Sequence, residues 1–316
     1  MSDVAATAPP VGRAPERVEL RAADGTRLVG CRFRAVGAPR ASLRMAGATG
    51  VPQGFYRRFA EHAATRGHEV MTLDYRGVGQ SAPPTLRGYR MDYLDWARQD
   101  LAGAVDAHVH PQRPLLMVGH SFGGQAFGLL PKYDRVAAFY TFATGAGWHG
   151  SMPGAERLRV LLLWHVLGPL LTRATGYLAW RRLGLGEDLP LDLYRQWRHW
   201  CRFPRYFFDD PAMAGVAEAF ARVRTPIVAA NALDDRWAPP RSRDAFMAAY
   251  RGADWTPVDV DPAAGLGPIG HMGYFRPAAR ALWDAALDWL EHPSGPRCAT
   301  PTRAQREDAV GPGTRR

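Results

Sequence analysis

The sequence is poor in lysine and has no block of basic residues. Lys132 is the only lysine, so arginine makes up the rest of the 40 basic residues, and the net charge is +10. These arginines are spread along the chain. Nucleic-acid binding requires basic residues gathered on one face of a recognisable module, and the sequence shows neither. We expect no nucleic-acid partner, and at most a mild attraction to anionic surfaces or acidic substrates.

Cysteine is also scarce, and its spacing excludes several classes of site. The three cysteines are far apart and form no CxxC pair: Cys31, Cys201 and Cys298. This usage suits a reducing compartment better than a disulfide framework. Because no group of residues has metal-ligand spacing, we expect neither a metal nor an organic cofactor. No basic segment followed by an apolar core opens the chain, so we expect a cytoplasmic location.

Long apolar runs are missing as well. The longest, residues 160–171, contains His165 and Pro169 and is too short to span a bilayer. We therefore expect no stable membrane insertion, and contact of this run with a membrane surface stays an open alternative. Overall, 47% of the residues are hydrophobic and 22% are charged, as in ordinary globular proteins. The Ala- and Pro-rich residues 1–15 and the Pro-, Gly-, Thr- and Arg-rich residues 292–316 are predicted to be disordered tails.

Strand and helix patterns alternate along most of the chain. Two apolar segments flank Asp24-Gly25, which predicts an antiparallel hairpin. Strands are predicted over 17–22, 27–34, 41–46, 68–74, 114–119, 135–142, 225–230 and 255–260. Helices are predicted over 54–64, 93–109, 124–130, 241–250 and 276–290. This alternation favours an α/β fold, with a mostly parallel sheet of about eight strands and helices on both faces.

The alternation stops between the sixth and seventh predicted strands. Residues 148–222 show helices, aromatic residues and Pro-Gly punctuation, but no strand pattern. We interpret this segment as a helical insert in a core formed by residues 16–147 and 223–291.

Gly-His-Ser-Phe-Gly, at residues 119–123, stands between a predicted buried strand and a predicted helix. A Gly-x-Ser-x-Gly turn in that context is the nucleophile elbow of serine hydrolases. The turn exposes the serine hydroxyl above the sheet, and Ser121 is therefore the predicted nucleophile.

A serine nucleophile requires a base and a group that orients the base. Asp234 and Asp235 follow the predicted strand 225–230, and His271 follows the next strand in a glycine-rich loop. The carboxyl ends of strands in such sheets lie together, so these loops are expected to meet near Ser121. Other histidines, including His120 inside the elbow, lack this place in the order of the chain.

Several segments resemble the α/β-hydrolase superfamily, over residues 17–291. Residues 119–123 resemble its elbow, and residues 74–81 resemble its Asp-x-Arg-Gly-x-Gly-x-Ser segment. Residues 235–239 resemble its acid loop, in which an aspartate precedes a proline by four, and this spacing favours Asp235 over Asp234. Gly270-His271 resembles its histidine loop. The chain looks similar to a bacterial branch near the serine-aminopeptidase and monoacylglycerol-lipase-like hydrolases, which implies a serine hydrolase.

The oxyanion hole expected from this resemblance needs two backbone N–H donors. One is Phe122, directly after the nucleophile. Residues 47–51 depart from the His-Gly pair of relatives, and Thr49-Gly50 is taken to replace that pair, which makes Val51 the second predicted donor. The glycines of residues 74–81 would also suit a phosphate-binding loop, but the segment lacks the lysine of such loops. A structural turn is therefore favoured.

The insert is expected to act as a lid that selects the substrate. It holds five of the ten tryptophans: Trp148, Trp164, Trp180, Trp197 and Trp200. Most are expected to pack the lid on the core, and a few to line an apolar acyl pocket. A further hypothesis is that an arginine reads an anionic substrate group, with the candidates Arg195, Arg198, Arg202 and Arg205.

The sequence thus predicts a hydrolase of carboxylic esters or related acyl bonds, acting on a small-molecule substrate of apolar or anionic character. The predicted triad is Ser121, Asp235 and His271. Amidase, peptidase or acyltransferase activity on the same triad is the first alternative. A catalytically inactive ligand-binding protein is the second.

Overall fold

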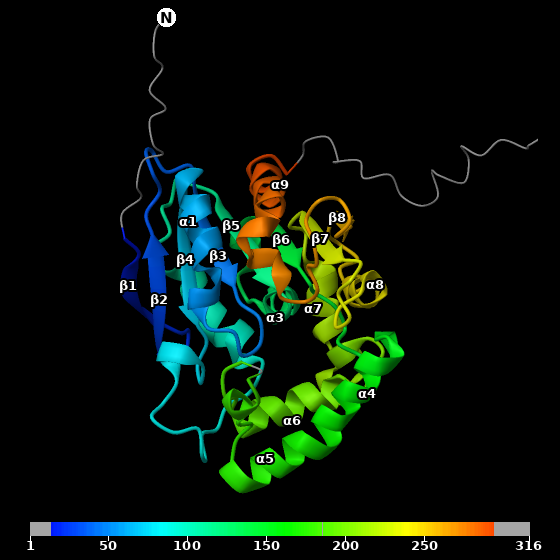
Figure 1. The fold of residues 1–316 in the computed structure, drawn as a ribbon. Coiled ribbons are helices and arrows are strands. Elements are labelled where there is room, and N and C mark those ends of the chain that lie inside the picture. Colours follow the sequence, from blue (N-terminus) through cyan, green and yellow to red (C-terminus); the bar gives the residue numbers. More distant parts are fainter. Residues whose placement is uncertain (1–13, 185, 294–316) are drawn as a thin grey trace, which may run out of the picture.

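The strands form one sheet in the computed structural model, which describes residues 14–184 and 186–293 (Figure 1). In this part of the chain the order across the sheet is β1-β2-β4-β3-β5-β6-β7-β8. The strands are β1 (Glu16–Arg21), β2 (Arg27–Phe33), β3 (Ala41–Ala46), β4 (His68–Asp74), β5 (Leu115–His120), β6 (Val136–Phe142), β7 (Ile227–Ala232) and β8 (Trp255–Val260). The predicted tails lie almost wholly outside the described residues.

The pairing confirms the predicted mostly parallel sheet with an antiparallel N-terminal hairpin. β1 pairs antiparallel with β2, and β2 with β4, whereas every other neighbouring pair is parallel. Every residue of β3, β5 and β7 is buried, because helices cover both faces of a parallel sheet. This explains why β5 and β7 are mostly apolar, whereas β1 alternates between exposed and buried residues.

Two apolar clusters hold the helices on the two faces. Phe59 of α1 and Trp283 of α9 pack in one cluster, and Phe122 of α3 and Phe246 of α8 pack in the other. The helices of the core are α1 (Arg57–Thr65), α2 (Ala102–Asp106), α3 (Phe122–Gln125), α8 (Pro240–Met247) and α9 (Arg280–Glu291). The helix predicted over 93–109 is instead a π-helix, Trp96–Leu101, followed by α2.

Residues 148–222 are helical, as predicted, and follow the sixth strand. They form α4 (Gly154–Leu162), a π-helix (Leu163–Leu167), α5 (Gly168–Thr175), α6 (Leu191–Trp200) and α7 (Val216–Arg222). Figure 1 shows α4, α5 and α6 grouped beyond one end of the sheet. The backbone N–H of Glu187 donates to Gly50 O at 3.0 Å, and that of Tyr93 donates to Gln196 Oε1 at 2.6 Å. These bonds fasten the insert to loops of the core.

A methyl group at Gly123 is expected to destabilise the fold. A Cβ there would lie 2.0 Å from Ala46 O, between α3 and β3, where neither backbone has room to move. Overpacking of this kind costs about 3 kcal/mol, so Gly123→Ala should lower the urea midpoint of unfolding. Gly54→Ala is the matched control, because no heavy atom lies within 4 Å of the position of its added Cβ. Equal stability of the two variants would contradict the prediction.

Candidate active site

Ser121 stands at the tip of a strained turn between β5 and α3. Its backbone has φ +52° and ψ −110°, a conformation that non-glycine residues rarely adopt and that is concentrated at functional sites. The Ser121 N–H donates to Phe142 O at 2.9 Å, which ties the turn to β6. A Cβ at Gly124 would lie 1.8 Å from Thr144 Oγ1, so the elbow can be this tight only because the flanking residues are glycines.

The structure brings Ser121, His271 and Asp235 into one hydrogen-bonded chain. His271 Nε2 lies 3.0 Å from Ser121 Oγ, and His271 Nδ1 lies 2.9 Å from Asp235 Oδ2. A carboxylate only accepts hydrogen bonds, so Nδ1 carries the proton and Nε2 is free to accept the serine hydroxyl proton. Ser121 follows β5, Asp235 follows β7 and His271 follows β8, so the arrangement depends on the sheet topology.

Asp235 is held as a buried carboxylate. Its Oδ1 also accepts the backbone N–H groups of Trp237 and Ala238, each at 2.9 Å. Burial alone would raise the pKa of Asp235, but the charge and hydrogen bond of His271 and these two backbone donors outweigh it, and the pKa lies below its usual value. Asp235 therefore stays ionised beside the imidazole.

Asp234 binds the loop before His271 instead of the imidazole. Its two carboxylate oxygens accept the N–H groups of Ile269 and Gly270, each at 2.9 Å. These residues directly precede His271. The two neighbouring aspartates thus have different roles: Asp235 contacts the imidazole, and Asp234 fixes the loop that carries it.

His120, the residue before Ser121, links three of the site's loops. Its Nδ1 lies 3.0 Å from Tyr56 Oη, and its Nε2 lies 2.9 Å from the carbonyl oxygen of His271. Tyr56 Oη accepts the N–H of Ala48 at 2.7 Å. Burial, together with the nearby His271, lowers the pKa of His120 to about 3, so this ring is neutral and acts as a hydrogen-bonding spacer. Sequence reasoning gave His120 no such role, because its partners are distant in the chain.

The loop after β3 offers a donor other than the one predicted. The Val51 N–H donates to Ala48 O at 3.2 Å and closes a turn, so the structure gives this predicted oxyanion donor another acceptor. The Ala48 N–H is bonded to Tyr56. Within the described residues, the N–H groups of Thr49 and Phe122 donate to no acceptor. Thr49 and Val51 both line the cavity above Ser121, so the unoccupied N–H of Thr49 is what favours it over Val51.

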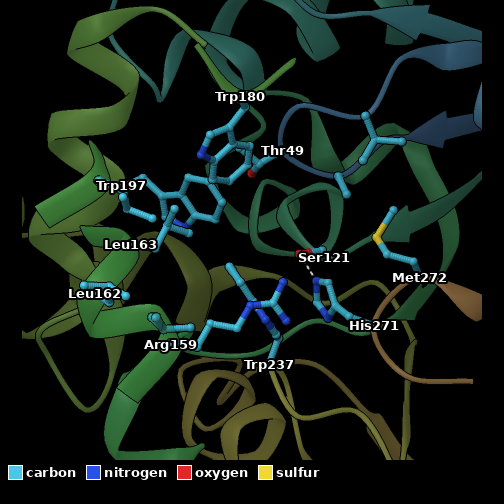
Figure 2. Close-up of a pocket in the computed structure, with 14 residues that line it drawn as sticks. Thr49, Ser121, Arg159, Leu162, Leu163, Trp180, Trp197, Trp237, His271 and Met272 are labelled. Carbon is cyan, nitrogen blue, oxygen red and sulfur yellow. Dashed lines mark hydrogen bonds between the residues drawn. The ribbon is translucent and has the colours of Figure 1, made fainter. Parts of the chain in front are cut away.

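A cavity of about 320 Å³ opens above Ser121 and His271 (Figure 2). Its walls are mostly apolar and come from both the insert and the core: Ala48, Thr49, Val51, Ser121, Arg159, Val160, Leu162, Leu163, Leu167, Trp180, Trp197, Trp237, His271 and Met272. This volume is at the lower end of the range for small-molecule sites, about 300–1,000 Å³. A second cavity of about 30 Å³ also borders Ser121 and His271.

Only some of the insert's tryptophans reach these cavities. Trp180 and Trp197 line the larger one, and Trp164 and Trp197 line the smaller one. Trp200 instead stacks on Tyr93, with ring centroids 6.0 Å apart, and donates to Asp210. Neither lining includes Trp148 or the insert histidines at 149, 165 and 199 in the described part of the chain.

The four arginines singled out in the sequence do not line the larger cavity in the described structure. Arg198 donates to Trp164 O and lies over the ring of Tyr194. Arg202 contacts His199, Arg205 pairs with Asp209, and Arg195 lies 3.9 Å from Asp192. Arg159 of α4 is the arginine in the wall instead. No local sequence pattern sets Arg159 apart from the other arginines, because its place in the wall depends on how α4 lies over the site.

The remaining candidate features are structural. Asp74 accepts the N–H groups of Gln53 and Gln80 at 2.7 and 3.0 Å, so residues 74–81 form a turn that braces the loop after β3.

Among residues 14–184 and 186–293 no group of His, Cys, Asp or Glu side chains could hold a metal ion. No helix in these ranges is long and apolar enough to cross a membrane.

Comparisons with known proteins agree with the fold. Residues 39–180 match the model of a family described as serine aminopeptidase, S33, and no curated protein matches the sequence. A monoglyceride lipase from Saccharomyces cerevisiae has 15% identity and a TM-score of 0.63, covering 92% of this chain and 97% of its own. The α/β hydrolase GrgF from Penicillium has 17% identity and a TM-score of 0.59, and the match covers 88% of this chain and 98% of GrgF. An epoxide hydrolase from Vigna radiata has 14% identity and a TM-score of 0.57, and the match covers 88% of this chain and 98% of the epoxide hydrolase. The chain therefore has the α/β-hydrolase fold.

Proposed function

We propose that this protein is a serine hydrolase that cleaves a carboxylic ester through an acyl-enzyme intermediate. The observation that carries the proposal is the continuous hydrogen-bonded chain from Ser121 through His271 to the buried Asp235. This is the arrangement that serine nucleophiles require: a base within reach, and a group that orients the base.

In the proposed first step, His271 Nε2 takes the hydroxyl proton of Ser121 while Oγ attacks the ester carbonyl carbon. Asp235 holds Nδ1–H and stabilises the imidazolium. The imidazolium then returns the proton to the leaving alcohol, and the acyl group stays on Ser121. In the second step a water gives a proton to His271 and attacks the acyl carbon, which releases the acid and restores Ser121. The cavity of about 30 Å³ beside both residues is large enough for one water.

The oxyanion formed in each step needs preorganised donors. We assign this role to the backbone N–H groups of Phe122 and Thr49, which have no acceptor within the described structure. His120 is bonded to Tyr56 and to His271 O. These bonds fix the position of the loop after β3 relative to the loop that carries His271. Residues 148–222 act as the lid in this scheme, because α4, the π-helix, Trp180 and α6 together supply most of the apolar wall.

The lining of the cavities favours an ester over the N-terminus of a peptide. The matched family is described as an aminopeptidase, and recognition of a free amino group calls for a nearby anion. Neither cavity beside Ser121 has an aspartate or glutamate in its lining in the described part of the chain. Amide cleavage and acyl transfer to another alcohol use the same chemistry and are the alternatives to be tested.

The direct test is labelling with a fluorophosphonate probe, followed by mass spectrometry of the labelled peptide. We expect one adduct, on Ser121, because only an activated serine attacks this probe. The Ser121→Ala protein, shown to be folded, should not react. A folded wild-type protein that stays unlabelled would point to the inactive ligand-binding alternative. Esters, amides and added alcohols then separate hydrolase, amidase and acyltransferase activity.

A further inference from the structure

Arg159 places an unused positive charge in the wall of an apolar cavity. Its side chain reaches from α4 into the cavity that Ser121 and His271 line (Figure 2). It donates no hydrogen bond to any described residue, and its nearest carboxylate oxygen, Glu156 Oε1, lies 3.8 Å from Nη1. That oxygen already accepts Trp237 Nε1–H at 2.8 Å. The guanidinium donors therefore face the cavity and solvent.

Apart from His271, Arg159 is the only residue of the described cavity lining with a titratable side chain, and its neighbours there include Leu162, Leu163 and Trp197. A guanidinium in such surroundings offers five N–H donors in a fixed planar arrangement that fits a carboxylate or a phosphate. A neutral apolar substrate would leave these donors without a protein or ligand acceptor. A substrate with an anionic group would use them while its apolar part contacts leucine and tryptophan.

We infer that the enzyme selects esters that carry one anionic group on an otherwise apolar skeleton, and that Arg159 binds this anion. The inference rests on the proposed function, because it concerns the substrate of the same site. The shared ligand chemistry is an oxyanion, either the carboxylate of a half-ester or a phosphate monoester.

The test compares matched substrates. Three 4-nitrophenyl esters are compared by kcat/KM. The hydrogen glutarate carries a carboxylate, the pentanoate is its neutral analogue of the same chain length, and a third ester carries a terminal phosphate. Arg159→Gln should lower kcat/KM for an anionic ester about tenfold, through a higher KM, and should change the neutral ester less than twofold. Arg159→Lys should restore part of the loss. The arm with the larger loss identifies carboxylate or phosphate as the preferred anion.

Arg195→Gln is the matched control. Arg195 is also in the insert, has an acidic residue three positions earlier at 3.9 Å, and is 63% exposed, against 68% for Arg159. It does not line the cavity, so its variant removes the same net charge without touching the site. Equal losses for Arg159→Gln and Arg195→Gln, or equal losses on anionic and neutral esters, would overturn the inference.

A binding measurement separates failure of this inference from failure of the proposed function. Tryptophan fluorescence of the Ser121→Ala protein, titrated with the glutarate half-ester and with the neutral ester, reports affinity without turnover. Tighter binding of the half-ester that disappears when Arg159→Gln is added supports the role of Arg159, whatever the reaction. Neutral esters hydrolysed by Ser121 with no preference for the anion would overturn the inference and leave the proposed function intact.

Discussion

Ser121→Ala is expected to lower kcat for ester hydrolysis by about 10⁶-fold, the size of the loss when the nucleophile of such a triad is removed. The hydroxyl that lies 3.0 Å from His271 Nε2 is then absent, and no acyl-enzyme can form. KM should change little, because the cavity walls remain. Steady-state kinetics with a chromogenic ester at enzyme concentrations high enough to detect residual turnover check this result.

Ser242→Ala is the control for that experiment. Ser242 is buried, and its hydroxyl has no hydrogen-bond partner within the described residues, so its removal should leave kcat within twofold. Circular dichroism must show both variants folded. Retention of more than a hundredth of wild-type activity by Ser121→Ala would rule out Ser121 as the nucleophile.

Asp235→Asn is expected to lower kcat by about 10⁴-fold. The amide NH₂ next to Nδ1 favours the tautomer whose proton lies on Nε2, and that nitrogen can then no longer accept the proton of Ser121. The loss of negative charge also removes the stabilisation of the imidazolium. The measurement is kcat against pH for wild type and variant with the same neutral ester.

Asp234→Asn is the matched comparison, one residue away with the same change in charge. Its carboxylate holds the loop at Ile269 and Gly270 and does not contact the imidazole, so the expected loss is one of positioning, at most about 100-fold. If Asp234→Asn were the more damaging substitution, the assignment of Asp235 as the triad acid would be wrong.

The pH dependence follows from the sign of the shift at Asp235. Its pKa is lowered in the folded protein, so the carboxylate stays charged as the pH falls through the usual range of aspartate. Its contribution to stability is present above the unfolded-state pKa and is lost only as the pH falls through the lower folded-state value. Protonation of Asp235 should therefore not limit kcat in the usual pKa range of aspartate, and a wild-type kcat profile that falls with the usual pKa of aspartate would contradict the lowered pKa of Asp235.

The fold was predictable because its signals are local. Apolar runs indicated β5 and β7, because burial on two faces restricts which residues a strand can use, and the Asp24-Gly25 turn indicated the hairpin of β1 and β2. The glycines of the elbow are also a local requirement, since a Cβ at Gly123 or Gly124 would collide with backbone or side chain. The order of Ser121, Asp235 and His271 on successive strand ends needed only the topology that this alternation implies.

Other features were decided by contacts between distant parts of the chain. Asp235 rather than Asp234 faces His271 because the loop at Ile269 occupies the Asp234 carboxylate. The Val51 N–H closes a turn on Ala48, which leaves Thr49 as the free donor. Arg159 lines the cavity, whereas the arginines of α6 and the following loop have other partners, such as Trp164 O for Arg198 and Asp209 for Arg205. By itself the sequence determined where the strands lie along the chain and the residue types of the site, which depend on local patterns. Only the tertiary structure decided which neighbour takes each role, because that choice depends on which hydrogen-bonding groups are already occupied.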